Sequence, residues 1–222
     1  MTLPFGHDQF LDVFGAYNSV LWPAVVLLWI VTTGVVFGWL SGRRVDGRVL
    51  FALLAVHWAW SGIAYHWAFF RSTNPAAPVF AAMFILQAAL FTRIAFVSRA
   101  YAQAGFSVRG VAGGALVIYG LLYPLVGLFL GLESPRLPLF AVPCPTTLVT
   151  AGLLVTSVGV PRSSNVLPFL WAVVGSSAAF SLGIRADMAL IVAGAVLALD
   201  LLAPAALGAR VSGRSTTSRE DR

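Results

Sequence analysis

Residues 21–40 read LWPAVVLLWIVTTGVVFGWL, a run without a single charged side chain. A helix of about 20 apolar residues is what crosses the hydrocarbon core of a bilayer, which is about 30 Å thick. Trp22 and Trp39 stand near the two ends of the run, where indole rings anchor a span in the interface. The run therefore predicts a membrane-spanning helix.

The composition extends this interpretation to the whole chain. Of its 222 residues, 59% are hydrophobic and 10% are charged, whereas a soluble domain carries about 25% charged residues. So little charge cannot cover the surface of a soluble protein. We therefore expect an integral membrane protein.

Six further apolar runs follow the first, and together they predict an all-α bundle of about seven transmembrane helices. The six runs cover residues 50–70, 79–97, 111–132, 148–160, 166–184 and 188–207. Seven helices of about 20 residues use about 140 residues, so the loops are short and no separate soluble domain fits. We expect a single transmembrane domain over residues 21–208.

The fifth run is the irregular one. Residues 148–160 number 13, and a helix that rises 1.5 Å per residue needs about 20 to cross the core. Pro143 and Pro145 stand just before it. The span must either begin earlier, near Leu139, as a helix broken by proline, or be a half-helix.

Two shorter segments flank the transmembrane domain. In residues 1–20, Phe10, Phe14 and Tyr17 recur at helical spacing, which is typical of an amphipathic helix lying in the membrane interface. An ordinary helical lead-in to the first span is the alternative. Residues 209–222 are polar, and we expect them to form a disordered cytoplasmic tail.

The arginines indicate an orientation with the N-terminus outside and the C-terminus in the cytoplasm. With seven crossings, the outer loops hold Arg71, Arg136 and Arg185, and the inner loops and tail hold Arg43, Arg44, Arg48, Arg99, Arg109, Arg162, Arg210, Arg214, Arg219 and Arg222. Cytoplasmic loops of membrane proteins carry such an excess of positive charge. We expect a multi-pass membrane protein.

The residue types present exclude several classes of protein. No lysine is among the 14 basic residues, so a retinal or pyridoxal Schiff base and a P-loop are excluded. A single cysteine, Cys144, excludes an intramolecular disulfide and a thiolate zinc cluster. His57 and His66 face opposite sides of one helix at 3.6 residues per turn, and no other span has a histidine, which excludes a bis-histidine haem. We predict no cofactor, and the net charge of +6 does not indicate nucleic-acid binding because the arginines lie at helix ends.

Three ionisable residues fall in the inner half of the predicted spans. His57, Arg93 and Asp200 lie within about 5 Å of one another in depth. Charged groups inside a membrane are costly and often functional. Arg93 could pair with Asp200 near His57, either as a proton or ion relay or as a structural ion pair, with Arg93 extending to the interface.

A second group lies near the outer ends of the spans. The outer pocket candidates are His66, Asn74, Cys144, Thr146 and Thr147. Pro143 and Pro145 interrupt regular backbone bonding beside them, and irregular backbone at membrane depth is tolerated where it lines a cavity. His66 and Cys144 could bind a soft metal or act as base and nucleophile. The alternative is a proline-rich loop that re-enters the interface, with Cys144 as a small buried hydrophobe.

Small residues recur at four-residue spacing in several spans. Gly34 and Gly38 are one such pair, and Gly127 and Gly131 are another. Such pairs let helices approach closely. We expect this packing within one chain in preference to a homo-oligomer, which stays the alternative.

The chain resembles an uncharacterised family of small polytopic bacterial membrane proteins, known as a domain of unknown function. The resemblance rests on Leu3-Pro4-Phe5, Gln9-Phe10, Tyr17-Asn18, Trp22-Pro23, Tyr65-His66-Trp67, Asn74-Pro75 and, most specifically, Pro143-Cys144-Pro145-Thr146-Thr147. It implies a polytopic inner-membrane protein and no established activity, so it assigns no catalytic residue. It favours the outer group over the inner group.

These observations favour a transporter or channel for a small solute or ion, with an outward-facing pocket. The inner residues would then serve as a gate or in proton coupling. One alternative is a membrane-embedded enzyme or a metal- or cofactor-binding subunit that uses His66 and Cys144. Another is an accessory subunit of a larger membrane complex. Besides the solute, the expected partners are the lipid bilayer and a second copy of the chain.

Overall fold

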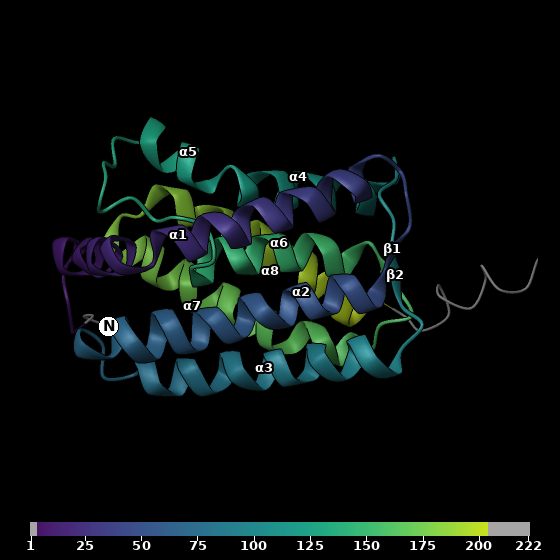
Figure 1. Cartoon of the computed structure of the whole chain (residues 1–222), viewed down its shortest axis with the longest axis horizontal. Helices are drawn as coiled ribbons and strands as arrows, with labels where there is room; N and C mark the ends of the chain where they lie inside the picture. The colour runs from purple at the N-terminus through teal and green to yellow at the C-terminus, as the bar shows by residue number, and fades with distance from the viewer. Residues whose placement is uncertain (1–3, 204–222) are drawn as a thin grey trace, which may run out of the picture.

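The computed structural model describes residues 4–203, and it confirms the all-α prediction (Figure 1). The α-helices are α1 (His7–Leu40), α2 (Gly47–Trp60), α3 (Ala77–Val97), α4 (Val108–Leu121), α5 (Tyr123–Phe129), α6 (Pro143–Val155), α7 (Val166–Leu182) and α8 (Ala189–Leu202). A π-helix, Ser61–Phe69, and a 3-10 helix, Phe70–Ser72, continue α2. Two further 3-10 helices, Arg162–Asn165 and Arg185–Met188, precede α7 and α8. The tail expected at 209–222 lies outside the described residues.

Several of these helices are long and apolar enough to cross a membrane. Four stretches meet this description: His7–Leu40, Gly47–Ser72, Ala77–Val97 and Arg162–Leu182. A fifth candidate is α4 together with α5, which are bent by 66° from one another. Trp29 of α1 donates its indole N–H to the Leu121 carbonyl oxygen at this bend, 2.9 Å away. By length and composition, the described residues therefore support four or five spans.

α6 lies inside the bundle and is the half-helix that the sequence allowed. All 13 of its residues are buried. The preceding residues, 137–142, are not helical and are mostly buried as well, and Ala141 has a left-handed φ of 66°. The helix begins at Pro143 and not near Leu139. Proline suits this first turn because its missing N–H would have no helical partner there.

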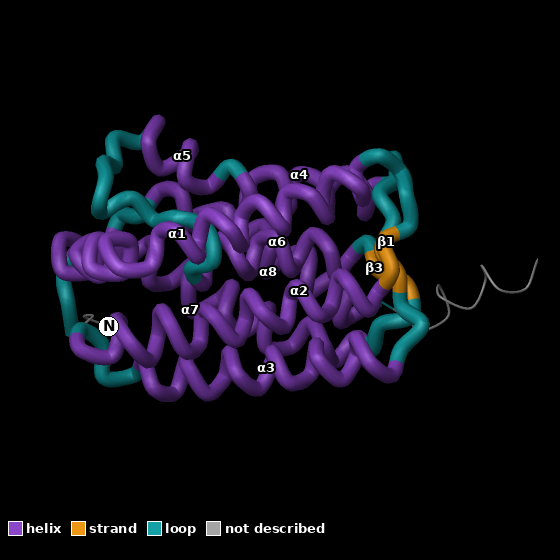
Figure 2. Tube along the Cα trace, in the orientation of Figure 1, coloured by secondary structure: helices purple, strands orange, loops and turns teal. Residues whose placement is uncertain are grey.

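Three loops at one end of the bundle are joined by a small antiparallel sheet that the sequence did not predict (Figure 2). Its strands lie in the order β1 (Val45–Asp46), β2 (Tyr101–Ala102) and β3 (Ser157–Val158), with Val45 opposite Ala102 and Tyr101 opposite Val158. In the same loops and the adjoining first helical turns lie Arg43, Arg44, Arg48, Arg99, Arg109 and Arg162. This end is called the sheet end below, and the other is called the open end.

The first part of α1 packs on the rest of the protein at the open end. Phe14 and Tyr17 are buried, with ring centres 5.4 and 5.9 Å from that of Tyr65. The predicted helical spacing is thus present, but no break separates it from the first span. At 1.5 Å per residue, a straight helix of 34 residues would extend about 51 Å, which exceeds a core of about 30 Å, but α1 contains Pro23 and changes direction along its length (Figure 1).

Glycines allow close contact between α4 and α6. A Cβ atom at Gly152 would lie 2.3 Å from the carbonyl oxygen of Gly113, and one at Gly113 would lie 2.7 Å from that of Gly152. By contrast, a Cβ atom at Gly34 or Gly38 would have no neighbour within 4 Å. The small residues of the first span therefore do not pack within the described part of the chain.

Candidate functional site

A π-helix supplies part of the candidate site. Ser61–Phe69 contains Ser61, Tyr65 and His66, all of them buried. Because π-helical bonds join residues five apart, each residue turns less around the axis than in an α-helix, and π segments are frequent at functional sites. His57 and His66 are both buried, although their spacing in an α-helix predicts opposite faces.

Six buried side chains meet at the open end, and we call them the outer polar cluster. They are Tyr65, His66, Tyr123, Cys144, Trp171 and Asp187. They come from the π-helix, α5, the start of α6, α7 and the 3-10 helix before α8. The cluster therefore joins segments that are far apart in the sequence.

Asp187 is the charged centre of this cluster and was missed in the sequence. Its carboxylate accepts a hydrogen bond from the Tyr123 hydroxyl, and the Cys144 thiol lies beside it as a second donor. Burial raises the pKa of Asp187 from 3.8 to about 6, and these two donors lower it in part. No positively charged side chain contributes to that shift. The carboxyl group therefore gains or loses its proton near neutral pH.

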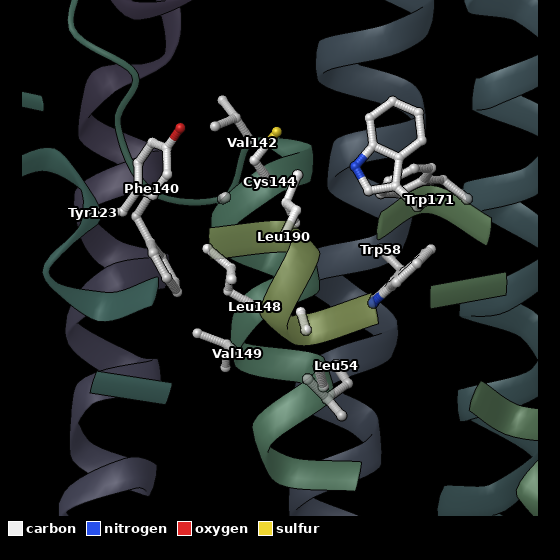
Figure 3. Close-up of a cluster of buried hydrophobic side chains, with 14 of the residues drawn as sticks. Leu54, Trp58, Tyr123, Phe140, Val142, Cys144, Leu148, Val149, Trp171 and Leu190 are labelled. Atoms are coloured by element: carbon white, nitrogen blue, oxygen red, sulfur yellow. The ribbon is translucent and has the colours of Figure 1, made fainter. Parts of the chain in front are cut away.

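Other members of the cluster carry polar atoms that have no hydrogen-bond partner within residues 4–203. They are the Tyr65 hydroxyl, both ring nitrogens of His66 and the indole nitrogen of Trp171. Figure 3 shows the nitrogen edge of Trp171 turned toward Cys144, although no hydrogen bond of normal geometry forms. A buried polar group without a partner costs about 1–3 kcal/mol, so such groups are rare unless water or a ligand satisfies them.

Aromatic rings surround His66. The ring of Trp171 lies 5.0 Å from it, that of Phe84 4.9 Å and that of Phe80 5.6 Å, measured between centres. An apolar wall of this kind strengthens electrostatic interactions inside the cluster. The unpaired donors and acceptors are therefore held in an environment of low dielectric constant.

The other predicted outer residues divide between this region and local structure. Thr146 lies next to the cluster, with its Oγ1 3.4 Å from Ser61 Oγ, and Ser61 donates to the Ala141 carbonyl oxygen. Thr147 donates to the backbone of its own helix, and Asn74 accepts a hydrogen bond from the backbone N–H of Ala76. The structure thus brings His66, Cys144 and Thr146 to one region, whereas Asn74 and Thr147 make local bonds.

The three inner candidates are not assembled into one group. Asp200 pairs with Arg109, and it accepts a hydrogen bond of 2.7 Å from Asn165. Arg93 is exposed, and no ion pair joins it to Asp200 among residues 4–203. The predicted ion pair between Arg93 and Asp200 is therefore wrong. Two residues at the same depth in a membrane need not lie on neighbouring helices.

His57 also lies apart from Asp200. Its Nε2 atom is 2.7 Å from Thr32 Oγ1, and its ring packs edge-on against Phe140 at 5.1 Å. This contact joins α1 and α2 through His57 Nε2, whereas His57 Nδ1 has no hydrogen-bond partner among the described residues. The contacts of His57 are those of a buried residue in the helix core.

The described residues offer little for a metal or for paired acid–base chemistry. Within 4–203, no three residues among His, Cys, Asp and Glu come close enough to hold a metal ion. Neither ring nitrogen of His66 has a hydrogen-bond partner in the described part of the chain, so His66 does not accept the Cys144 proton in this conformation.

Comparison with known protein families identifies the family of this chain. A family model described as "Family of unknown function (DUF6064)" matches residues 7–212. No curated protein and no solved structure matches this chain.

Proposed function

We propose that this chain, which belongs to the family of unknown function DUF6064, moves a small solute or ion across a membrane through the outer polar cluster. The observation that carries the proposal is Asp187. It is a buried carboxyl group that pairs with no cation among residues 4–203, in a cluster where polar atoms of Tyr65, His66 and Trp171 lack partners. A solute or hydrated ion would supply those missing partners.

The backbone around the cluster supports a transport role. α6 is a half-helix preceded by the non-helical segment 137–142, and the Ala141 carbonyl oxygen in that segment is bonded to Ser61. In many transporters, broken helices of this kind form the binding site near the middle of the membrane. Irregular backbone is tolerated there because it is buried in protein or lines a cavity.

Proton exchange at Asp187 would fit coupled transport. The raised pKa of about 6 lets the carboxyl group release or accept a proton near neutral pH. Since the group is buried and has no fixed cation, it can exchange a proton for a cation or polar solute. Its position in a short 3-10 helix between α7 and α8 puts it close to the open end.

For the topology we propose seven crossings of the bacterial inner membrane, with the N-terminus outside and the C-terminus in the cytoplasm. The path of the chain supports this, since α1, α2 with its π-helix, α3, α4 with α5, α6, α7 and α8 run alternately along the bundle (Figure 1). The arginines at the sheet end would face the cytoplasm, as the positive-inside rule requires. The open end and its outer polar cluster would then face outward.

A membrane enzyme that uses His66 and Cys144 is the less favoured candidate. A base must lie within hydrogen-bonding reach of the proton that it takes. The His66 ring nitrogens have no such contact in the described structure. Asp187, and not His66, is the partner of the Cys144 thiol.

Transport can be tested in liposomes that contain the purified protein and a trapped pH-sensitive dye. Gradients of protons, Na⁺ and K⁺ are imposed in turn on wild type, Asp187→Asn and Glu133→Gln. Glu133 is an exposed carboxylate near the open end, so Glu133→Gln makes the same chemical change outside the cluster. We expect flux in wild type and Glu133→Gln and a loss of at least about tenfold in Asp187→Asn. Equal flux through wild type and Asp187→Asn would contradict the proposal.

A further inference from the structure

A long apolar groove runs between α2 and α3 on the outside of the bundle. It has a volume of about 440 Å³. Alanines form its floor, because Ala52, Ala55 and Ala59 of α2 face Ala88 and Ala89 of α3. Its margins carry larger exposed side chains, among them Val56, Ile85 and Phe96.

The groove has the chemistry of a site for a hydrocarbon chain. Thr92 is its one polar lining residue in the described structure, and the Thr92 hydroxyl donates to the Ala88 carbonyl oxygen at 2.9 Å. The Thr92 proton is therefore already used, and among the lining side chains only the Thr92 oxygen could still accept a hydrogen bond from a ligand. Because the groove lies on two helices that are candidate spans, lipid tails are the medium that it would contact.

Positive charge lies at the sheet end of the same groove. Arg48 is four residues before Ala52, so it stands one turn below it on the same face of α2. Arg99 follows α3 by two residues, just beyond the groove residue Phe96. Both arginines are exposed, and no ion pair involves either within residues 4–203. An apolar groove with two unpaired guanidinium groups at its end matches an acyl chain with an anionic headgroup at its end.

A second copy of the chain fits this groove less well. Two copies in one membrane have the same orientation, so a two-fold interface would place both sheet ends at the same depth. Arg48 and Arg99 of one copy would then face the same arginines of the other. Like charges at such an interface repel, whereas a phosphate group neutralises them.

We propose that the groove between α2 and α3 is a binding site for one anionic phospholipid, with an acyl chain along the alanine floor and the phosphate at Arg48 and Arg99. The site depends on the groove and on the arginines of the sheet end. It does not depend on transport through the outer polar cluster, so the two proposals can fail separately.

Native mass spectrometry of the full-length protein in neutral detergent tests this site. Phosphatidylglycerol or phosphatidylcholine with identical acyl chains is added, and the bound fraction is measured against lipid concentration. The headgroup variant is Arg48→Gln with Arg99→Gln, and its control is Arg71→Gln with Arg185→Gln, which removes the same charge at the open end. The groove variant is Ala89→Phe, and its control is Ala82→Phe, an exposed alanine of α3 outside the groove.

We expect wild type and both controls to bind phosphatidylglycerol about tenfold or more tightly than phosphatidylcholine. The headgroup variant should lose this preference, and Ala89→Phe should weaken binding of both lipids. Unchanged phosphatidylglycerol binding in the headgroup variant would overturn the proposal. Displacement of the lipid by millimolar inorganic phosphate would indicate a site for a free anion and would also overturn it. The proposal would also be overturned if wild type formed a dimer without bound lipid and Ala89→Phe dissociated that dimer.

Discussion

The Tyr123 hydroxyl donates a hydrogen bond to the buried carboxylate of Asp187, and this bond joins the start of α5 to the link between α7 and α8. The bond thus connects the bend between α4 and α5 to the segment that links α7 and α8 at the open end. The carboxyl group that accepts this bond is buried, and no ion pair of the described residues includes it. Stability and proposed transport should therefore both respond to Asp187.

The pH dependence of stability is the first consequence. The folded protein holds the Asp187 proton more tightly than the unfolded chain, because burial raises the pKa from 3.8 to about 6. Its stabilising contribution is therefore complete below pH 3.8 and is lost as the pH rises through about 6. The loss amounts to about 3 kcal/mol at about 1.4 kcal/mol per pKa unit. Thermal unfolding in detergent between pH 4 and pH 8 measures it.

We expect Asp187→Asn to remove this dependence. The difference in Tm between Asp187→Asn and wild type should grow in favour of the variant from pH 4 to pH 6.5 and then level off. Glu133→Gln, made at an exposed carboxylate, should follow the wild-type curve. Parallel curves for wild type and Asp187→Asn would show that Asp187 does not titrate in this range.

Removing the Tyr123 hydroxyl should raise the pH at which the Tm falls. The Tyr123 hydroxyl lowers the pKa of Asp187, so in Tyr123→Phe that pKa should exceed about 6 and the fall in Tm should extend to higher pH. Tyr119→Phe is the matched control, since the Tyr119 hydroxyl donates to the Ala186 carbonyl oxygen, 2.9 Å away. The same pH series of melting curves gives, for each variant, the pH at which half of the fall in Tm has occurred. An unshifted midpoint in Tyr123→Phe would argue against the Tyr123–Asp187 bond.

The close contact of α4 and α6 makes Gly152 sensitive to a single methyl group. A Cβ atom at this position would lie 2.3 Å from the backbone oxygen of Gly113, so Gly152→Ala must push the two helices apart. Overpacking of this kind costs about 1–3 kcal/mol or more. Gly34→Ala adds the same methyl group where no atom lies within 4 Å, and it should be neutral or slightly stabilising. Equal Tm values for the two variants would contradict the helix packing.

Thr32 should stabilise the protein through His57. Thr32→Val removes the bond of 2.7 Å to His57 Nε2 and leaves a buried imidazole without a partner, at a cost of about 1–3 kcal/mol. Thr33→Val is the control, because the Thr33 hydroxyl donates to the Trp29 carbonyl oxygen of its own helix. Thermal unfolding of the two variants side by side measures the difference. If Thr33→Val lowered the Tm as much as Thr32→Val does, the bond to His57 would not be the cause of the lost stability.

The features that could be predicted from the sequence are those that depend on local composition. The uncharged run 21–40 is sufficient to predict a helix, and the short run 148–160 after Pro143 and Pro145 is sufficient to allow a half-helix. The strands at the sheet end contain two residues each, so no periodicity could reveal them. Their pairing depends on loops that are brought together by the helices.

The site was predicted only in part, for a similar reason. The position of Cys144 beside two prolines marked the start of α6, and His66 could be assigned to the same end by its depth. Asp187 lies in a 3-10 helix of only four residues, and the hydrogen bond that it accepts comes from Tyr123, 64 positions earlier in the chain. Arg109, the partner of Asp200, could not be predicted. Depth in the membrane gives the height of a residue along its helix and not its direction around the helix axis.

Accessibility of Cys144 tests most directly whether the outer polar cluster opens outward. Cys144 is the one cysteine of the chain, so wild type needs no engineering, and Cys144→Ala gives the background. A membrane-impermeant maleimide is applied from outside to intact cells and from inside to inverted vesicles, and denatured protein gives full labelling. We predict labelling from outside that exceeds labelling from inside at least about tenfold. Labelling from inside alone, or from neither side, would contradict an outward-opening site.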